Sequence, residues 1–368
     1  MRDVAVVRLG IALGAIVLGL VVGCGGGGSG SQGGSSASGG DTADAAAKRF
    51  LDRYVQADGR VRRIDEGDDT VGEGQAYGML IAAASGDSQR FDSIWNWTKE
   101  NIRRPDKLIS FKWRDGRIED PQPASDADVD AARALLVASC RFNRPAQRQE
   151  ALELGRAILA HEIAESQGKP VLTAGPWANE EPQTINPSYF SPATFAALST
   201  ASRDDKWGSL SASSREITSA LMTDSSPLPP DWARLEGGRA VPIGTPDDPG
   251  GTPKFSFDAP RTLVRMAEDP DKAGQEIAAR AWPVFEGEDP AKMVVERDLG
   301  GSPAGGSQHP IVLVAAAGAA DAAGQDDARD RLLDAAAALD QRSPTYYGAA
   351  WVALGRYMLT TDALDVCQ

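Results

Sequence analysis

The sequence predicts an all-α protein in which paired helices close into a toroid. Apolar residues three and four positions apart recur along the chain after Asp44, which is the periodicity of amphipathic helices. No stretch alternates apolar and polar residues convincingly as a long strand. An even number of helices, loops of very different length and the lack of a strict residue repeat favour a toroid over a solenoid.

The pattern predicts about twelve helices. They lie near residues 44–57, 74–86, 88–102, 127–143, 145–165, 191–202, 208–222, 259–268, 271–286, 308–322, 325–339 and 344–360. Proline and glycine gather between them, most heavily at 224–254. No second linker interrupts the pattern, so residues 44–368 are predicted to form one domain of about 320 residues.

The amino terminus has the pattern of an export signal. Arg2 and Arg8 form a short basic region before an apolar run at 11–22, and this run is short for a membrane span. The run ends in Val-Val-Gly-Cys, which resembles the lipobox of bacterial lipoprotein signal peptides. The resemblance implies a signal peptide at 1–23, cleavage before Cys24 and a lipid on its sulfur. A plain secretory signal and an uncleaved anchor are the alternatives.

A glycine and serine segment follows this leader. Residues 25–40 contain only one Gln and one Ala besides Gly and Ser, a composition typical of a flexible tether. We therefore predict a tether at 24–43 that holds the folded domain off a membrane. We expect the protein to be exported and to lie at the bacterial cell envelope, where its lipid anchor contacts the membrane.

Charge and residue counts exclude several classes of function. The net charge of −14 lacks the basic footprint that nucleic-acid binding needs, and it favours neutral or cationic partners. His161 and His309 are the two histidines and have no metal-ligand spacing, so we predict no metal and no cofactor. A serine hydrolase would need a Gly-x-Ser-x-Gly elbow, which is absent from the sequence.

Two further cysteines, Cys140 and Cys367, lie within the predicted domain. Export would permit a disulfide between them. The position of Cys140 in a helical pattern instead favours a small core residue, which is the interpretation preferred here.

Glu73 stands between glycines in Val-Gly-Glu-Gly-Gln-Ala-Tyr-Gly-Met at 71–79, where an apolar helical pattern begins. Glycine in a helix interior costs about 1 kcal/mol, so these glycines indicate the close approach of a ligand or of another helix. Thr70 and Glu73 fit a capping box. A catalytic role is the alternative for Glu73.

A second acidic segment begins the helix predicted at 127–143. Ser125 and Asp128 fit another capping box, which leaves Asp126 as a spare acid in the first turn. Such an acid is favourable near a helix amino terminus by about 0.3–1 kcal/mol. Asp130 is expected to be solvated or paired with Arg133.

A third acid, Asp258, is expected to cap a helix that has Pro260 just inside its start. In a barrel of paired helices, the inner helices run parallel and their amino ends meet. Glu73, Asp126 and Asp258 are therefore expected to converge on one cleft.

These segments resemble glycoside hydrolase family 8. Glu73 lies in a match to Ser-Glu-Gly-Gln-x-Tyr-Gly-Met, residues 124–128 match Ala-Ser-Asp-Ala/Gly-Asp, and residues 257–261 match Tyr-Asp-Ala-x-Arg. Residues 186–189 and 230–232 resemble further shared segments. The five matches keep a consistent order between residues 47 and 360, which makes the resemblance specific.

The resemblance implies an (α/α)6 barrel and an endo-acting, inverting hydrolase of β-1,4-linked glucan, expected to be a monomer. Glu73 would be the general acid, Asp258 the base and Asp126 the residue that holds the sugar at the cleavage point. An inverting mechanism places acid and base about 6.5–9.5 Å apart. Xylan or chitosan hydrolysis by the same family and a non-catalytic glycan-binding lipoprotein are the alternatives.

Two positions depart from the family pattern. Gly72 replaces the usual Ser, which removes a hydrogen bond. Phe257 replaces the usual Tyr beside the base, so a hydroxyl that could orient Asp258 is missing. Reduced activity and a base held in another way, for instance by Arg261, are the two alternatives. A general acid also needs a raised pKa, for which an ionised Asp126 beside Glu73 is the expected cause.

Sugar-binding clefts use aromatic faces together with polar groups for the hydroxyls. The predicted substrate-binding residues are Trp113, Tyr189, Asn186, Arg261, Tyr77 and Trp232. Trp177 is a further aromatic candidate because it lies in or near a loop, and Arg117 could supply hydrogen bonds. Trp95, Trp97 and Trp351 lie inside helical patterns and are predicted to be core residues.

Overall fold

The computed structural model describes residues 41–367. The predicted signal peptide, Cys24 and the tether up to residue 40 lie outside the described residues. Among residues 41–367, no helix is both long and apolar enough to cross a membrane.

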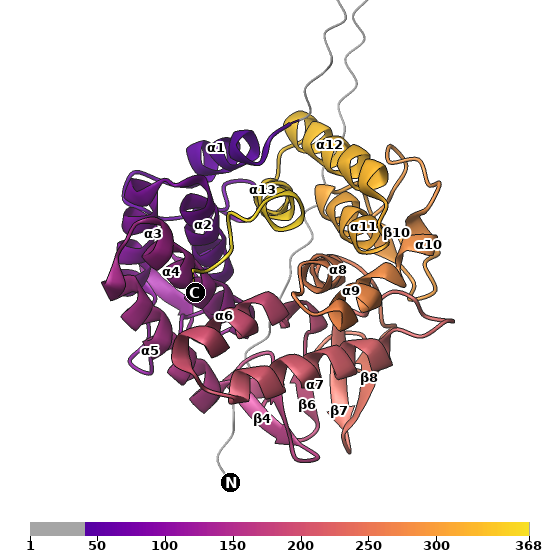
Figure 1. Cartoon of the computed structure of the whole chain (residues 1–368), viewed down its shortest axis with the longest axis horizontal. Helices are drawn as coiled ribbons and strands as arrows, with labels where there is room; N and C mark the ends of the chain where they lie inside the picture. The colour runs from indigo at the N-terminus through magenta and orange to yellow at the C-terminus, as the bar shows by residue number, and fades with distance from the viewer. Residues whose placement is uncertain (1–40, 368) are drawn as a thin grey trace, which may run out of the picture. The chain divides into compact units, whose positions relative to one another are not determined.

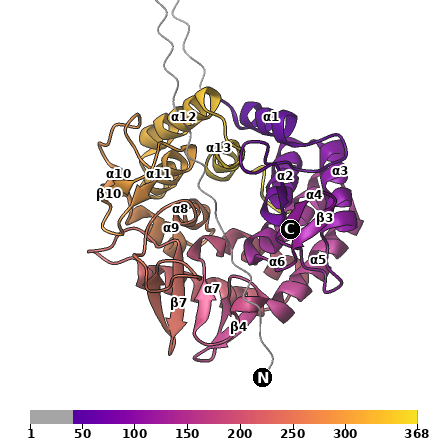
Figure 2. The same cartoon turned by 180° about the vertical axis from the view of Figure 1, so that it is seen from behind.

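Helices in two layers dominate this part of the chain (Figure 1). The inner ring consists of α2 (Gly72–Ser85), α4 (Ser125–Arg141), α6 (Pro192–Ser202), α8 (Ala259–Ala267), α11 (Pro310–Ala322) and α13 (Tyr346–Thr360). The outer layer consists of α1 (Ala43–Tyr54), α3 (Ser88–Asn101), α5 (Pro145–His161), α7 (Lys206–Leu221), α9 (Lys272–Ala279) and α12 (Asp326–Arg342), with the short α10 (Trp282–Phe285). Figure 2 shows the same ring from behind. The predicted (α/α)6 barrel is confirmed.

Burial follows this division into layers. Nearly every residue of α2 and α11 is buried, as is typical of helices enclosed on all sides. Outer helices such as α3 bury one stripe and expose the rest. Most of the predicted helices match observed ones within a few residues, but the one predicted at 271–286 is divided into α9 and α10. Pro283 lies at the start of α10, where its missing N–H is tolerated.

Short strands lie in the loops and none exceeds five residues in the described chain. One antiparallel sheet joins β1 (Thr70–Val71), β2 (Lys112–Arg114) and β3 (Arg117–Asp120). Another joins β6 (Gln183–Ile185), β7 (Trp232–Glu236) and β8 (Arg239–Ile243). Two-stranded pairs are β4 (Ile163–Ser166) with β5 (Lys169–Leu172), and β9 (Glu296–Arg297) with β10 (Pro303–Gly305). Single 3₁₀ turns lie at η1 (Pro176–Ala178) and η2 (Pro187–Tyr189).

Three ion pairs connect α4 to α8 across the barrel. They are Asp126 with Arg261, Asp130 with Arg265, and Arg133 with Glu268. The partners in each pair are 135 residues apart, so the pairs follow the same order along both helices. The helices α4 and α8 therefore run parallel, as expected of inner barrel helices.

These pairs correct the expectation for Asp130. Its carboxylate is buried and accepts two hydrogen bonds from Arg265, at 2.8 and 2.7 Å. Arg133 instead donates to Glu268. The side chains of Asp130 and Arg133 both lie on the face of α4 that meets α8, and each pairs across the barrel with the oppositely charged residue 135 positions later, which gives each buried charge its own partner.

Both predicted capping boxes are wrong. The Thr70 hydroxyl donates to the carbonyl of Val61, and the Ser125 hydroxyl donates to the carbonyl of Thr173. The amino-terminal cap positions of α2 and α4 are Val71 and Ala124, and neither has a side-chain cap hydrogen bond. Tertiary acceptors therefore take the hydroxyls that the local pattern assigned to helix ends.

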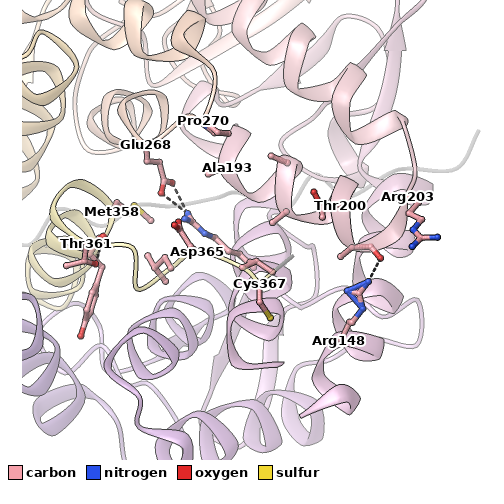
Figure 3. A pocket seen from close by; sticks show the side chains of 17 residues that line it. Arg148, Ala193, Thr200, Arg203, Glu268, Pro270, Met358, Thr361, Asp365 and Cys367 are labelled. Carbon is pink, nitrogen blue, oxygen red and sulfur yellow. Dashed lines mark hydrogen bonds and ion pairs between the residues drawn. The ribbon is translucent and has the colours of Figure 1, made fainter. Parts of the chain in front are cut away.

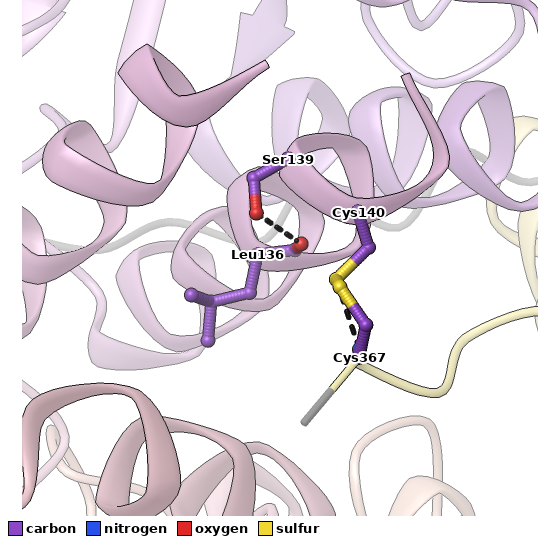
Figure 4. The surroundings of a disulfide bond; sticks show 4 residues. All are labelled: Leu136, Ser139, Cys140 and Cys367. Atoms are coloured by element: carbon purple, nitrogen blue, oxygen red, sulfur yellow. Dashed lines mark hydrogen bonds between the residues drawn. A yellow bond between two sulfur atoms is a disulfide. The ribbon is translucent and has the colours of Figure 1, made fainter. Parts of the chain in front are cut away.

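Cys140 and Cys367 form a disulfide, so the preferred interpretation of Cys140 as a reduced core residue is wrong (Figure 4). Cys140 lies in the last turn of α4 and Cys367 near the carboxyl terminus of the chain. The bond pins the last residues of the chain over the carboxyl ends of the inner helices. A pocket of about 610 Å³ lies beside it, lined by Arg133, Glu268, Met358 and Cys367 among others (Figure 3).

Candidate active site

Glu73 lies in the first turn of α2, directly after the β1 strand that pairs with β2. A side chain at position 74 would place its Cβ 2.8 Å from the hydroxyl of Tyr346 on α13, so Gly74 permits the close approach of that helix. A Cβ at position 72 would lie 3.0 Å from the Ser110 carbonyl oxygen. The glycines around Glu73 therefore serve close packing of the chain, one of the two uses that the sequence indicated.

Burial raises the pKa of Glu73 to about 8, although about a fifth of its side chain remains exposed (21%). The guanidinium of Arg261 opposes this rise in pKa, and the charges of Asp126 and Asp258 add to it. The expected effect of Asp126 on the pKa of Glu73 thus has the predicted sign, but burial is the larger cause. At neutral pH the Glu73 carboxyl is protonated.

Asp126 lies at the second residue of α4 and is 1% exposed. Its Oδ2 accepts a hydrogen bond of 2.8 Å from Nη1 of Arg261, and its Oδ1 accepts one from the backbone N–H of Ala127. Burial also raises the pKa of Asp126, while Arg261 lowers it. Asp126 is therefore a second carboxyl within the field of Glu73, but it is turned toward the guanidinium.

Asp258 precedes α8, with Pro260 in the first turn as predicted. Its side chain makes no cap hydrogen bond, so the capping role expected for it is wrong. Its Oδ1 instead accepts a hydrogen bond of 2.6 Å from Nη2 of Arg261, and about a third of the side chain is exposed (31%). Arg261 therefore holds Asp258 in the way proposed to compensate for Phe257.

The amino end of α8 is capped by Asp231 instead, from the loop before β7. Its Oδ1 accepts hydrogen bonds from the backbone N–H groups of Ser256, Asp258 and Ala259. Burial and the nearby charge of Asp258 raise the pKa of Asp231 to about 7, against the effect of these N–H groups. The Pro-Asp-Trp segment at 230–232 is the sequence signal that could have identified this cap.

Arg261 joins the three predicted catalytic carboxyls. Besides the contacts to Asp126 and Asp258, its Nη1 lies 3.5 Å from Oε2 of Glu73 and donates to the hydroxyl of Tyr77 at 2.9 Å. Its guanidinium carbon lies 5.3 Å from the centre of the Tyr189 ring. The predicted convergence of Glu73, Asp126 and Asp258 is therefore present, around a single buried arginine.

The structure places the predicted substrate-binding residues in two groups. Trp113 and Trp232 are half-buried, and Trp232 packs edge-on against Tyr189 with ring centres 6.1 Å apart. Tyr77, Arg261 and Asn186 are buried. The Asn186 Oδ1 accepts hydrogen bonds from the N–H and hydroxyl of Ser188, while its Nδ2 has no acceptor among the described residues.

Exposed aromatic rings also lie near the amino ends of the inner helices. Trp177 and Phe257 are 43% and 41% exposed. Trp177 follows Gly175, which packs against the carbonyl of Pro123 just before α4. Arg117 is exposed on β3. Trp95, Trp97 and Trp351 are buried, which confirms their prediction as core residues.

Sequence reasoning missed two residues beside the carboxyls. The hydroxyl of Tyr347, at the start of α13, donates to the carbonyl of Phe257 at 2.8 Å. His309 caps α11 through its ring nitrogen and lies edge-on to Phe257. Burial lowers the pKa of His309 to about 4, so this ring is neutral. Neither residue lies in a sequence motif that predicts a place in the site. Both come close to Phe257 only in the folded chain, from positions far along the sequence.

No group of three or more His, Cys, Asp or Glu side chains among residues 41–367 is arranged to hold a metal ion. A protonated carboxyl and an ionised one on either side of a substrate form the pair that glycoside hydrolysis requires. In this barrel, the protonated Glu73 and the ion-paired Asp258 are carboxyls of these two kinds.

Comparison with known proteins identifies the family. Residues 35–355 match the model described as glycosyl hydrolases family 8, and this chain belongs to that family. A probable endoglucanase of Novacetimonas hansenii is 30% identical over 230 residues, which cover 59% of this chain and 66% of that protein. The chain thus aligns with just under two thirds of the length of this relative.

Solved structures agree with the fold. An endo-β-1,4-glucanase from Acetobacter xylinum superposes with a TM-score of 0.73 and 25% identity, covering 87% of this chain and 98% of that one. A β-1,3-1,4-glucanase from Paenibacillus sp. X4 superposes with a TM-score of 0.76 and 19% identity, covering 86% and 90% of the two chains.

Proposed function

We propose that this protein is an endo-acting hydrolase of β-1,4-linked glucan that uses Glu73 as general acid and Asp258 as general base. The observation that carries the proposal is the contrast between these two carboxyls on one guanidinium. Glu73 is protonated at neutral pH and lies at the longer distance from Arg261, whereas Asp258 forms a close ion pair with it. Relatives named endoglucanases support glucan as the substrate.

The proposed reaction has one step. A water molecule attacks the anomeric carbon, its proton passes to Asp258, the glycosidic C–O bond breaks and Glu73 gives its proton to the departing oxygen. Glu73 and Asp258 contact different nitrogens of Arg261, and the inverting reaction requires room for one water between the two carboxyls. Asp126 keeps Arg261 in place and raises the pKa of Glu73.

Exposed aromatic rings support a carbohydrate substrate. Phe257, next to Asp258 in the chain, and Trp177 are exposed, and Trp113 and Trp232 are half-buried. Aromatic faces can pack on the apolar faces of sugar rings while polar groups bind the hydroxyls. We propose that these four rings line the glycan path.

The test is reducing-end release from carboxymethylcellulose, mixed-linkage β-glucan, xylan and chitosan, with Glu73→Gln as the control. We expect the fastest turnover on a β-1,4-glucan and its loss in the variant. Fastest turnover of xylan or chitosan would replace the substrate assignment. Glycan binding without turnover would favour the alternative of a non-catalytic lipoprotein, and turnover that survives Glu73→Gln would refute the acid assignment.

We also propose that the mature protein is exported and lipid-anchored through Cys24 to the bacterial cell envelope. The Cys140–Cys367 disulfide supports an oxidising compartment. Metabolic labelling with a fatty acid, followed by detergent fractionation, tests this proposal. Wild-type protein should carry the label and Cys24→Ala should not, whereas unlabelled wild-type protein would refute the anchor.

A further inference from the structure

Asp128 and Glu162 are buried carboxyls that the proposed reaction does not use. Asp128 lies in the first turn of α4, and Glu162 directly follows α5; both are fully buried at 0% exposure. Asp128 Oδ1 accepts a hydrogen bond of 2.9 Å from the backbone N–H of Ile109. Asp128 Oδ2 and both carboxyl oxygens of Glu162 have no donor within residues 41–367.

Besides burial, a hydrogen bond between the two carboxyl groups shifts their pKa values, raising that of Glu162 and lowering that of Asp128. Two ionised carboxylates have only acceptors, so they cannot bond to each other and would repel. One shared proton makes one group a donor and satisfies the other. Burial raises the pKa of both groups well above the ordinary carboxyl value, which keeps that proton bound at neutral pH.

Charged groups around the pair do not replace the proton. Asp126 on α4 and Asp106 in the preceding loop add negative charge and raise the pKa values of both carboxyls further. Arg104 is the cation that faces the pair, but it donates to Asp106 and to the carbonyl of Pro121. Arg104 and, to a smaller degree, the neighbouring His161 ring lower the pKa of Asp106.

The pair is connected by hydrogen bonds to the backbone at the start of α2, which carries Glu73, and of α4, which carries Asp126. On one side, Asp128 binds the N–H of Ile109, and two residues later the carbonyl of Phe111 accepts the N–H of Gly72 next to Glu73. On the other side, the carbonyl of Glu162 accepts both the N–H and the hydroxyl of Thr173.

Thr173 continues this connection to α4. Its carbonyl accepts the hydroxyl of Ser125, and the carbonyl of Ala174 accepts the N–H of Ser125. Asp126 follows directly in the chain. The junction between the end of α5 and the start of α4 therefore fixes the turn that carries Asp126.

We propose that Asp128 and Glu162 share a single proton, and that the hydrogen-bonded pair acts as a positioning device for Glu73 and Asp126. The positioning part rests on the proposed function, whereas the shared proton does not. Ionisation of the pair would separate the end of α5 from the start of α4.

The first experiment detects the proton. The infrared difference spectrum of wild type minus Glu162→Gln at pH 7 should contain the C=O stretch of a protonated carboxylic acid. The pH dependence of urea unfolding between pH 6.5 and 8.5 should also differ between wild type and Glu162→Gln. The native state holds a proton that the unfolded state releases, so the unfolding constant of wild type should rise about tenfold more per pH unit than that of the variant.

A matched control is Asp340→Asn, which removes another buried carboxyl on α12, outside the pair. Burial raises the pKa of Asp340 to about 6, so the slope of its variant above pH 6.5 should equal that of wild type. Equal slopes for wild type and Glu162→Gln, with no carboxylic acid band, would overturn the shared proton.

The second experiment tests positioning through kcat. Glu162→Gln still donates a hydrogen bond to Asp128 and should keep kcat within about twofold, whereas Glu162→Leu cannot and should lose about tenfold or more with a smaller change in KM. A purely structural role would lower stability but leave the kcat of folded Glu162→Leu unchanged, which would refute positioning. Should the Leu variant fail to fold, a tenfold loss of kcat in Glu162→Gln would refute it instead. An inactive wild type would refute the proposed function while leaving the first experiment valid.

Discussion

Arginine–carboxylate pairs join α4 to α8 at both ends of the barrel, but the number of carboxylates per arginine differs between the two ends. At the carboxyl end, Arg133 donates to both oxygens of Glu268, and these side chains are 5% and 4% exposed. At the amino end, one guanidinium, that of Arg261, contacts Asp126, Asp258 and Glu73. The pair between them, Asp130 with Arg265, is also one-to-one.

The two ends differ in how many carboxyls share one guanidinium. In a one-to-one buried pair each charge has its own partner, and removing either residue leaves the other buried and uncompensated. Three carboxyls share the guanidinium of Arg261, and Glu73 lies farthest from it. Burial is the main cause of the Glu73 pKa of about 8, the charges of Asp126 and Asp258 add to it, and such a value would suit the proposed general acid.

The largest effect is expected from Glu73→Gln, which removes the proton donor while keeping the shape of the side chain. We expect kcat on the preferred glucan to fall by about 10²–10⁴-fold, the usual contribution of a general acid. Glu216→Gln, an exposed carboxyl on α7, is the control and should keep full activity. Comparable activity in the two variants would contradict the catalytic assignment of the amino end.

The next effect is on stability. Arg265→Met leaves Asp130 buried without its partner, and we expect the free energy of unfolding in urea to fall by about 3–5 kcal/mol. Lys169→Met breaks an exposed pair with Glu216 and should cost less than about 1 kcal/mol. Equal losses in the two variants would show that the pairs between α4 and α8 are not structural.

Loss of the disulfide at the carboxyl end should lower the stability of the protein but leave its activity unchanged. Replacing Cys140 and Cys367 by Ser opens a connection across 227 residues and should cost about 2–4 kcal/mol of unfolding free energy. Reduced wild type should match the double variant. We expect kcat to stay unchanged, because the carboxyls of the active site lie at the other end. A loss of kcat in the folded variant would contradict this separation of the two ends.

The smallest effect concerns pH. Asp126→Asn removes a negative charge that raises the pKa of Glu73, so the pKa of Glu73 should fall from about 8 by about one unit, or ~1.4 kcal/mol. Because the acid must be protonated, kcat/KM should begin to decline at lower pH than in wild type. The measurement is the alkaline side of the kcat/KM profile. An unchanged profile would remove Asp126 from this role.

Much of the architecture was predictable because it depends on local patterns. Apolar spacing identified the helices, and Pro260 marked the start of α8. The strands were not predicted, since segments as short as β1 alternate too little to be recognised and form by pairing with distant residues. The partner of Asp130 was also out of reach, because Arg265 is 135 residues away.

The sequence by itself determined the helical toroid, the acids at the starts of its helices and their resemblance to one hydrolase family. It also indicated Arg261 as a holder of Asp258. Only the tertiary structure decided which carboxyl keeps a proton, because the pKa of Glu73 depends on burial and on charges from three other segments. It likewise decided that Thr70 and Ser125 bond to distant carbonyls and that Cys140 pairs with Cys367. Helix periodicity is local, whereas burial and pairing belong to the folded chain.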